Sequence, residues 1–452
     1  MELSLQQQKE IGFAYIMERL QPDSPYGRQA KKELRPFSRE ENWELELAIE
    51  DIRLMREAVL KEEAQFARIS VELGHFFWIQ SSVKRIADGT AGEVDFFELK
   101  RYLLSWNALA VMLRRYSPLD GLFTESLNEP LALLDPANTG TPTFAYSSDK
   151  LERIRFEKAR AQGGRRLMLA AEEEREERAE QNRLCKSLSP HMEAVFKSMK
   201  AIARFDMALC KARLALQDGA VLPEFGEGGL RFAEMINPKV SAEIAPRRFH
   251  PITIELNIGS AVITGANMGG KSVTLSTLAL NVYLAHCGLA VYAKEARLPL
   301  LDGLYLLGDT GREAQAGLSS FAKEVGALKR VMEAADGERL SLILLDEPAR
   351  GTNPHEGALI ARGLCRYGNN SGDFYLIATH YDGVAEEART SYQIAGLKPL
   401  DIDGGRFGAE AIAMNMDYSL LKIEGDTQVP RDAQRIMRLM GVSAELLRLI
   451  ES

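Results

Sequence analysis

The residues with the clearest capacity for chemistry form a glycine-rich loop, GANMGGKS, at residues 265–272. An apolar stretch typical of a strand, AVIT at 261–264, precedes the loop, and a helical pattern follows it at 273–284. Glycine lets backbone N–H groups approach phosphate oxygens, and a helix N-terminus favours anions. This arrangement is typical of an ATP-binding loop with a lysine for the β- and γ-phosphates and a serine for Mg²⁺. The predicted ATP-binding residues are Gly265, Ala266, Asn267, Met268, Gly269, Gly270, Lys271, Ser272 and Val273.

Two carboxylates follow a second predicted strand. Residues 340–345, LSLILL, form a continuous apolar run that suits a parallel strand buried on both faces. The run ends at Asp346 and Glu347, and α/β sheets bind ligands at the carboxyl ends of their strands. We predict that Ser272 and Asp346 are the Mg²⁺ ligands and that Glu347 polarises the attacking water. An Asp-Glu pair after a strand says little alone, but the phosphate loop upstream makes the pair specific.

A third predicted strand, FYLIA at 374–378, ends at Thr379 and His380. A histidine at this position could contact the γ-phosphate and sense its loss, whereas an isolated histidine is more often a structural residue. The predicted catalytic residues are therefore Glu347, His380 and Lys271. Ser319 and Ser320 stand at the start of a predicted helix, where they could simply cap it or could offer polar groups to the γ-phosphate of another subunit.

The rest of the chain supplies the elements that must position these residues. Apolar spacing predicts helices from about residue 5 to 120, and the stretch 134–146 is rich in turn residues and then β-prone. Residues 150–184 read as a charged helix pair interrupted by Gly163 and Gly164, either a solvated arm or a grip on a partner. A helix at 190–217 and glycines near 219–229 precede an α/β pattern. The predicted fold class is α plus α/β.

Composition excludes several classes of protein. The net charge of −8 argues against a dedicated nucleic-acid binder, although a local basic face is still compatible with it. The four cysteines are far apart, and they and the scattered histidines form no pattern typical of disulfides or zinc. We find no apolar signal segment and no stretch long enough to span a membrane, so we expect no membrane partner and a cytoplasmic location.

Together, these motifs resemble the MutS family of ABC-type ATPases. The loop at 265–272 differs from the usual family loop mainly at Ala266, where the family has proline. The segment LSSF at 318–321 is similar to the family's signature loop, and DEPARGTN at 346–353 is similar to its metal-binding strand and dimer loop. ATHY at 378–381 and VYA at 291–293 also fit. The resemblance covers most of residues 230–390.

The resemblance implies a P-loop NTPase that uses ATP and Mg²⁺ and closes as a homodimer, with Ser319 and Ser320 acting in trans. It also implies three parts of the chain. Residues 1–125 would be a helical core and lever region, and residues 126–218 a clamp-like strand-and-helix arm. Residues 219–452 would be the ABC-type ATPase domain with a short helical C-terminus. The family's mismatch-reading and nuclease domains are not expected, and the Phe-x-Glu at Phe96 is interpreted as chance.

A narrower resemblance is to the small MutS-like ATPases that accompany adenosylcobalamin-dependent lysine 5,6- and ornithine 4,5-aminomutases. It rests on IGF at 11–13, SPYG at 24–27, DP at 135–136, PTF at 142–144 and VPRDA at 429–433. It implies a protein client, a cobalamin-dependent aminomutase, which the ATPase would reactivate with a second reactivase subunit. The alternative is a DNA-binding ATPase of mismatch repair or recombination that acts on mismatched or branched DNA. A purely structural ATP-binding adaptor is disfavoured because the catalytic set is intact.

Overall fold

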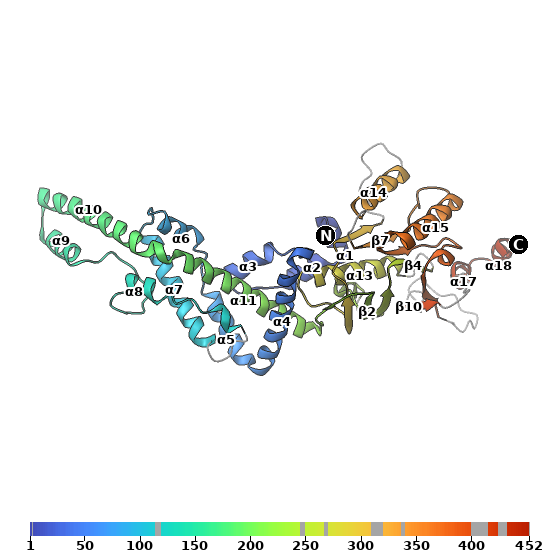
Figure 1. The fold of residues 1–452 in the computed structure, drawn as a ribbon, viewed down its shortest axis with the longest axis horizontal. Helices are drawn as coiled ribbons and strands as arrows, with labels where there is room; N and C mark the ends of the chain where they lie inside the picture. Colours follow the sequence, from blue (N-terminus) through green and yellow to red (C-terminus); the bar gives the residue numbers. More distant parts are fainter. Residues whose placement is uncertain are drawn as a thin grey trace. The chain divides into compact units, whose positions relative to one another are not determined.

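The computed structural model describes residues 1, 3–113, 119–244, 249–265, 270–308, 320–335, 340–398, 415–423 and 432–451 (Figure 1). The chain packs as two units. Unit 1 comprises Met1–Leu20, Arg35–Ile49 and Leu214–Ser452, and unit 2 comprises Gln21–Leu34 and Glu50–Arg213. A helical region is followed by an α/β region, which confirms the predicted fold class. The division into parts at residues 125 and 218 stays a prediction.

Unit 2 is helical in the residues that the structure describes. Its helices are α3 (Pro25–Lys32), α5 (Glu63–Gly74), α6 (Gln80–Ala87), α7 (Glu93–Leu113), α8 (Asn128–Leu134), α9 (Asp149–Arg160) and α10 (Gly163–Leu188). Helices α4 (Asn42–Lys61) and α11 (Met192–Asp218) contribute residues to both units. Large side chains fill the core of unit 2, among them Phe66, Phe96, Trp106 and Phe205. Because Phe96 is a buried residue of α7, its Phe-x-Glu presents no exposed wedge.

Helices α9 and α10 lie side by side (Figure 1) and match the predicted charged helix pair. Ion pairs join them: the Arg155 guanidinium contacts Glu173 and Glu177, and the Lys150 ammonium lies 2.5 Å from Glu176. The Lys158 ammonium also contacts Glu173. Few apolar side chains are buried along this pair. Exposed ion pairs contribute roughly 0–1 kcal/mol each, so the pair depends on several of them together.

The β-prone stretch near residue 142 forms no strand, because its surroundings bind it as a loop. The buried Lys100 ammonium lies 3.3 Å from the Asp135 carboxylate and donates to the carbonyl of Thr143 at 3.0 Å. The Asp135 carboxylate also accepts backbone N–H groups of Thr139 and Gly140. These hydrogen bonds hold the pKa of Asp135 at about 2 against the opposing effect of burial. A loop folded around one carboxylate leaves no run of backbone for strand pairing.

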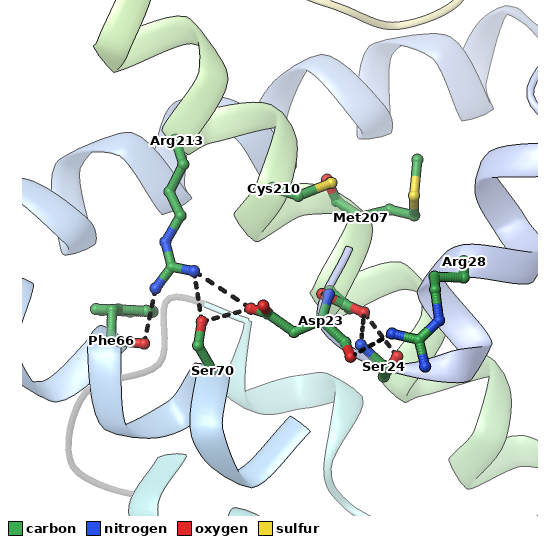
Figure 2. A network of polar contacts seen from close by, with 9 residues as sticks. Asp23, Ser24, Arg28, Phe66, Ser70, Met207, Cys210 and Arg213 are labelled. Carbon is green, nitrogen blue, oxygen red and sulfur yellow. Dashed lines mark hydrogen bonds and ion pairs between the residues drawn. The ribbon is translucent and has the colours of Figure 1, made fainter. Parts of the chain in front are cut away.

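A second buried carboxylate, Asp206 of α11, fixes the segment that starts α3. Its two oxygens accept hydrogen bonds from the backbone N–H groups of Asp23 and Ser24, at 3.0 and 2.7 Å, and from the Ser24 hydroxyl at 2.6 Å. Next to it, Asp23 accepts from Ser70 and lies 3.3 Å from the guanidinium of Arg213 (Figure 2). Burial raises the pKa of Asp206, and the hydrogen bonds from Ser24 and the Asp23 backbone oppose that shift.

Unit 1 contains a six-stranded sheet in the order β10-β9-β4-β8-β7-β6. The strands are β4 (Gly259–Thr264), β6 (Gly303–Leu307), β7 (Ser341–Asp346), β8 (Phe374–Ala378), β9 (Thr390–Leu397) and β10 (Met416–Ile423). Neighbours pair in parallel, except that β10 pairs antiparallel with β9. A four-stranded sheet has the order β1-β5-β2-β3, with strands β1 (Glu224–Phe225), β2 (Leu230–Met235), β3 (Ile252–Leu256) and β5 (Glu295–Leu298).

Among its described residues, unit 1 has the helices α1 (Leu5–Ile11), α2 (Phe13–Arg19), α12 (Pro238–Glu243), α13 (Lys271–His286), α14 (Ser320–Ala335), α15 (Pro354–Ser371), α17 (Asp432–Leu439) and α18 (Ala444–Glu451). The strands β7 and β8 are buried almost throughout, as their continuous apolar runs predicted. The N-terminal helices pack on α13, where the rings of Phe13 and Tyr283 meet edge to face. No helix in the described ranges is both long and apolar enough to cross a membrane.

The Asp206 network generates a stability prediction. A Cβ atom at Gly27 would lie 2.1 Å from an Asp206 oxygen, so Gly27→Ala must displace the buried carboxylate. Overpacking of this kind costs roughly 1–3 kcal/mol, and we expect a clearly lower thermal unfolding midpoint by circular dichroism.

The matched control is Gly74→Ala, because a Cβ atom at this helix end meets nothing within 4 Å. It should leave the midpoint nearly unchanged. Equal midpoints for the two variants would show that Asp206 tolerates a side chain at Gly27.

Candidate active site

Three adjacent strands bring the predicted site residues together. Strand β8 lies between β4 and β7, and the parallel register places Ala378 opposite both Ile263 and Asp346. Gly265 follows β4, Glu347 follows β7, and His380 lies two residues after β8. Because the three strands are parallel, their carboxyl ends meet at one edge of the sheet, where α/β folds bind ligands.

The described part of the phosphate loop has the backbone conformations that glycine permits. Gly265 has φ 137°, and Gly270 has φ 84° and stands immediately before α13. Lys271, Ser272 and Val273 form the first turn of that helix. The Lys271 ammonium donates to the carbonyl of Gly265 at 2.6 Å, which joins the two ends of the loop. The predicted residues Ala266, Asn267, Met268 and Gly269 lie outside the described residues.

The Glu347 carboxylate is the meeting point of charged groups from different segments. One of its oxygens lies 3.5 Å from the Lys271 ammonium and 3.5 Å from Nδ1 of His380. The other lies 3.9 Å from Nε of Arg350. Lys271 is buried, and burial lowers the pKa of its ammonium while the Glu347 charge opposes that shift. The structure thus gathers the three predicted catalytic residues into one cluster.

Asp346 is suited to a magnesium ion. Burial raises the pKa of its carboxyl, and a hydrogen bond from the Ser272 side chain is the largest opposing effect. Its Oδ1 is buried without a hydrogen-bond partner in the described parts of the chain, which is costly unless a ligand completes it. Those parts contain no group of three or more acidic, histidine or cysteine side chains placed to hold a metal ion. One carboxylate and one hydroxyl fit Mg²⁺, which keeps several waters and nucleotide oxygens.

The turn after β7 has an unusual backbone. Glu347 has φ 49° and Ala349 has φ 65°, a left-handed conformation that costs residues with a side chain of order 1 kcal/mol or more. The backbone N–H of Glu347 donates to the carbonyl of Ala378 at 2.9 Å, so the turn remains tied to β8. Such strain is common at functional sites, and the strained Glu347 is the residue whose carboxylate lies 3.5 Å from both Lys271 and His380.

An aromatic ring that the sequence did not predict lies beside the phosphate loop, and a second ring lies next to it. A Cβ atom at Gly270 would lie 3.2 Å from the ring of Tyr418, and the ring of His250 lies 6.0 Å from that of Tyr418. Tyr418 falls where the pairing of β10 with β9 shifts register, and bulges of this kind redirect side chains. No local motif marks Tyr418 or His250, because only the folded sheet brings Tyr418 to the loop and His250 to Tyr418.

The predicted trans residues are only partly visible. Ser319 lies outside the described residues. Ser320 is the first residue of α14, and the structure does not describe the Ser320 side chain. The roles given to Ser319 and Ser320 therefore stay predictions.

In this α/β sheet a glycine-rich loop joins β4 to the buried helix α13, and Asp346 and Glu347 stand at the carboxyl end of β7, with β8 between the two strands. This arrangement is typical of the class of α/β proteins that bind phosphate at the ends of parallel strands. Residues 261–409 match the family model of MutS domain V. A DNA mismatch repair protein MutS of Thermus thermophilus is 36% identical over 189 residues, or 42% of this chain and 23% of that protein. The one of Syntrophomonas wolfei is 33% identical over 200 residues, or 43% and 23%.

A third relative extends further along the chain. The Endonuclease MutS2 of Caldanaerobacter subterraneus subsp. tengcongensis is 27% identical over 276 residues, or 60% of this chain and 32% of that protein. The chain thus spans about a quarter to a third of the length of the curated relatives that it matches. The matched residues are similar to MutS and MutS2 proteins, and the matches do not show the aminomutase-associated subgroup.

Proposed function

We propose that this chain is a Mg²⁺-dependent P-loop ATPase of the MutS type that couples ATP turnover to an action on DNA. The observation that carries the ATPase proposal is the cluster at Glu347. A carboxylate between a buried ammonium and a histidine, beside a second carboxylate with an unpartnered buried oxygen, suits phosphoryl transfer to water.

Each residue has a role that its position supports. Lys271 would stabilise charge on the β- and γ-phosphates, and Ser272 and Asp346 would hold the metal. When bound, Mg²⁺ neutralises the charge that develops on the phosphate oxygens. Glu347 accepts a hydrogen bond from the attacking water and orients it. His380, within 3.5 Å of Glu347, detects the γ-phosphate. The rings of Tyr418 and His250 offer the adenine base an aromatic contact.

Hydrolysis depends on Glu347 in this proposal. Glu347→Gln should reduce the rate of phosphate release by about 100-fold or more, because an amide cannot polarise water as a carboxylate does. Its affinity for ATP should stay close to that of the wild type. Lys271→Ala should instead abolish ATP binding, because the loop loses its cation. Phosphate release and equilibrium binding of a fluorescent ATP analogue separate the two effects.

The matched control is Glu333→Gln on α14, whose side chain is 63% exposed and 3.6 Å from Lys329. It should hydrolyse ATP at the wild-type rate. A Glu347→Gln protein as active as this control would refute the assignment of Glu347.

The active sites are proposed to be shared across a homodimer, as the resemblance of residues 318–321 to a signature loop implies. Ser319→Arg and Lys271→Ala proteins should each be inactive. Mixing them should restore activity, because one of the two active sites in a mixed dimer combines an intact phosphate loop from one subunit with an intact Ser319 from the other. Phosphate release at increasing ratios of the two proteins measures the recovery; no recovery at any ratio would exclude sites formed in trans.

DNA is the proposed client because the matching relatives are named for DNA mismatch repair and as an endonuclease. In unit 2, the region where α9 ends and α10 begins carries exposed basic and apolar side chains. The Arg160 guanidinium lies over the ring of Phe156, and Arg165 is 75% exposed at 3.5 Å from Glu157. Farther along the pair, Arg155 and Lys158 are neutralised by glutamates. This end of the helix pair is therefore the best candidate for phosphate contacts.

A salt titration tests that surface. Binding of duplex, mismatched and branched DNA should weaken steeply with salt, because each phosphate contact contributes about 0.9 to the slope of log affinity against log salt. Arg165→Ala with Arg166→Ala should weaken binding and reduce that slope by up to about two. Fluorescence anisotropy of labelled DNA gives both quantities.

The matched control is Arg175→Ala with Arg178→Ala, which removes the same charge from exposed positions of the same helix. It should retain most of the affinity. No binding at any salt, or an equal loss in the control, would contradict the proposed DNA surface.

Reactivation of a cobalamin-dependent aminomutase stays a prediction from the sequence. Some residues of the narrower resemblance have packing roles that account for them without a client. Ser24 and Gly27 meet the buried Asp206, and Asp135 organises its own loop. No feature of the described residues points to a cobalamin enzyme.

A further inference from the structure

Side chains hydrogen-bond to both the backbone N–H and the backbone carbonyl of Ala349, which lies two residues beyond Glu347. Its N–H donates to the Glu324 carboxylate of α14, and its carbonyl accepts the hydroxyl of Tyr381 at 3.2 Å. Ala349 is only 2% exposed and has φ 65°. A buried backbone N–H that loses its acceptor is costly, so these two side chains stabilise the conformation of the turn.

Close packing reinforces this grip on the same turn. A Cβ atom at Gly351 would lie 3.0 Å from the backbone nitrogen of Phe321, at the start of α14. A Cβ atom at Gly357 of α15, beyond the turn, would lie 2.4 Å from the hydroxyl oxygen of Tyr381, so α15 packs against the hydroxyl that contacts Ala349. The turn after β7 thus lies against α14 on one side and against the segment after β8 on the other. Neither contact involves a residue that binds phosphate or metal in the proposed function.

We propose that Glu324 and Tyr381 are positioning residues for hydrolysis: they hold Ala349 in its left-handed conformation and thereby keep the Glu347 carboxylate aimed at the attacking water. This inference rests on the proposed ATPase function. It adds a link between α14 and the catalytic turn, since one end of the link is a side chain of α14. The helix begins at Ser320, beside the segment for which a contact with a second subunit is predicted.

The energetics favour an effect on rate more than on binding. Glu347 itself has φ 49°, so the turn contains two strained residues close together and relaxes readily if its support is removed. A displacement of about 1 Å in a catalytic group can reduce the rate by roughly 100-fold. The contacts of Lys271 and Ser272 with nucleotide and metal do not pass through Ala349, so affinity should change little.

Two variants of Glu324 separate the loss of its charge from the loss of the hydrogen-bond acceptor. Glu324→Ala should reduce the maximal rate of ATP hydrolysis by roughly 10- to 100-fold, with the dissociation constant of a non-hydrolysable ATP analogue within about threefold of wild type. Glu324→Gln should recover most of the rate, because its amide oxygen can still accept from Ala349. Tyr381→Phe should reduce the rate by a smaller factor. Glu333→Ala is the control on the same helix.

Three results would overturn the inference: an unchanged rate in Glu324→Ala, a loss of analogue affinity as large as the loss of rate, or a Glu324→Gln protein as slow as Glu324→Ala. If the wild type does not hydrolyse ATP, the proposed function fails. The hydrogen bond between Glu324 and the Ala349 N–H can still be tested by amide hydrogen exchange. Exchange at Ala349 should accelerate in Glu324→Ala and stay slow in Glu324→Gln, and equal exchange in both would reject the grip. Should Glu324→Ala not fold, Tyr381→Phe and Glu324→Gln give the same two readouts.

Discussion

The candidate active site depends on keeping the Lys271 ammonium and the carboxylates of Asp346 and Glu347 close together at a largely buried sheet edge. Each of these charges is costly to remove from water, and the pKa directions of Lys271 and Asp346 show that cost. Their mutual attraction offsets part of it, and Mg²⁺ and phosphate oxygens would complete the compensation. A site of this kind favours a ligand that brings matching charges, which is the property that an ATP-driven switch requires.

The surrounding structure serves to hold these charges in place. Strand β8 fixes the separation of β4 and β7, and the buried faces of β7 and β8 leave little freedom to either strand. The strained turn after β7 cannot persist by itself, and it is held by β8 through the Glu347 N–H, by α14 through Glu324, and by Tyr381. Contacts from three different segments therefore determine where one carboxylate lies. The same principle recurs in unit 2, where single buried carboxylates, Asp135 and Asp206, organise whole segments.

The sequence predicted the features that depend on local pattern. Continuous apolar runs indicated the buried strands β7 and β8, mixed charge indicated the pair α9–α10, and the pattern after the glycine loop indicated the helix α13. It could not predict that Tyr418 reaches Gly270 or that Glu324 grips Ala349, because these contacts join segments that only the fold brings together. It also misjudged the β-prone stretch near residue 142, where the buried Lys100–Asp135 pair overrides local preference. The packing of Met1–Leu20 within unit 1 likewise depends on distant residues, such as Asn237, whose side chain donates to the carbonyl of Ile11.

We propose that the charge cluster around Glu347 binds a complex of Mg²⁺ and ATP and hydrolyses the nucleotide. The most direct measurement is the rate of phosphate release from ATP by the wild-type chain as the Mg²⁺ concentration is raised from zero under chelator. We expect no turnover without the metal and a saturable rise with it, because Asp346 and Ser272 would form a site that needs the ion to neutralise phosphate charge. Phosphate release that is absent at saturating ATP and Mg²⁺, or that is equally fast with chelator present, would contradict it.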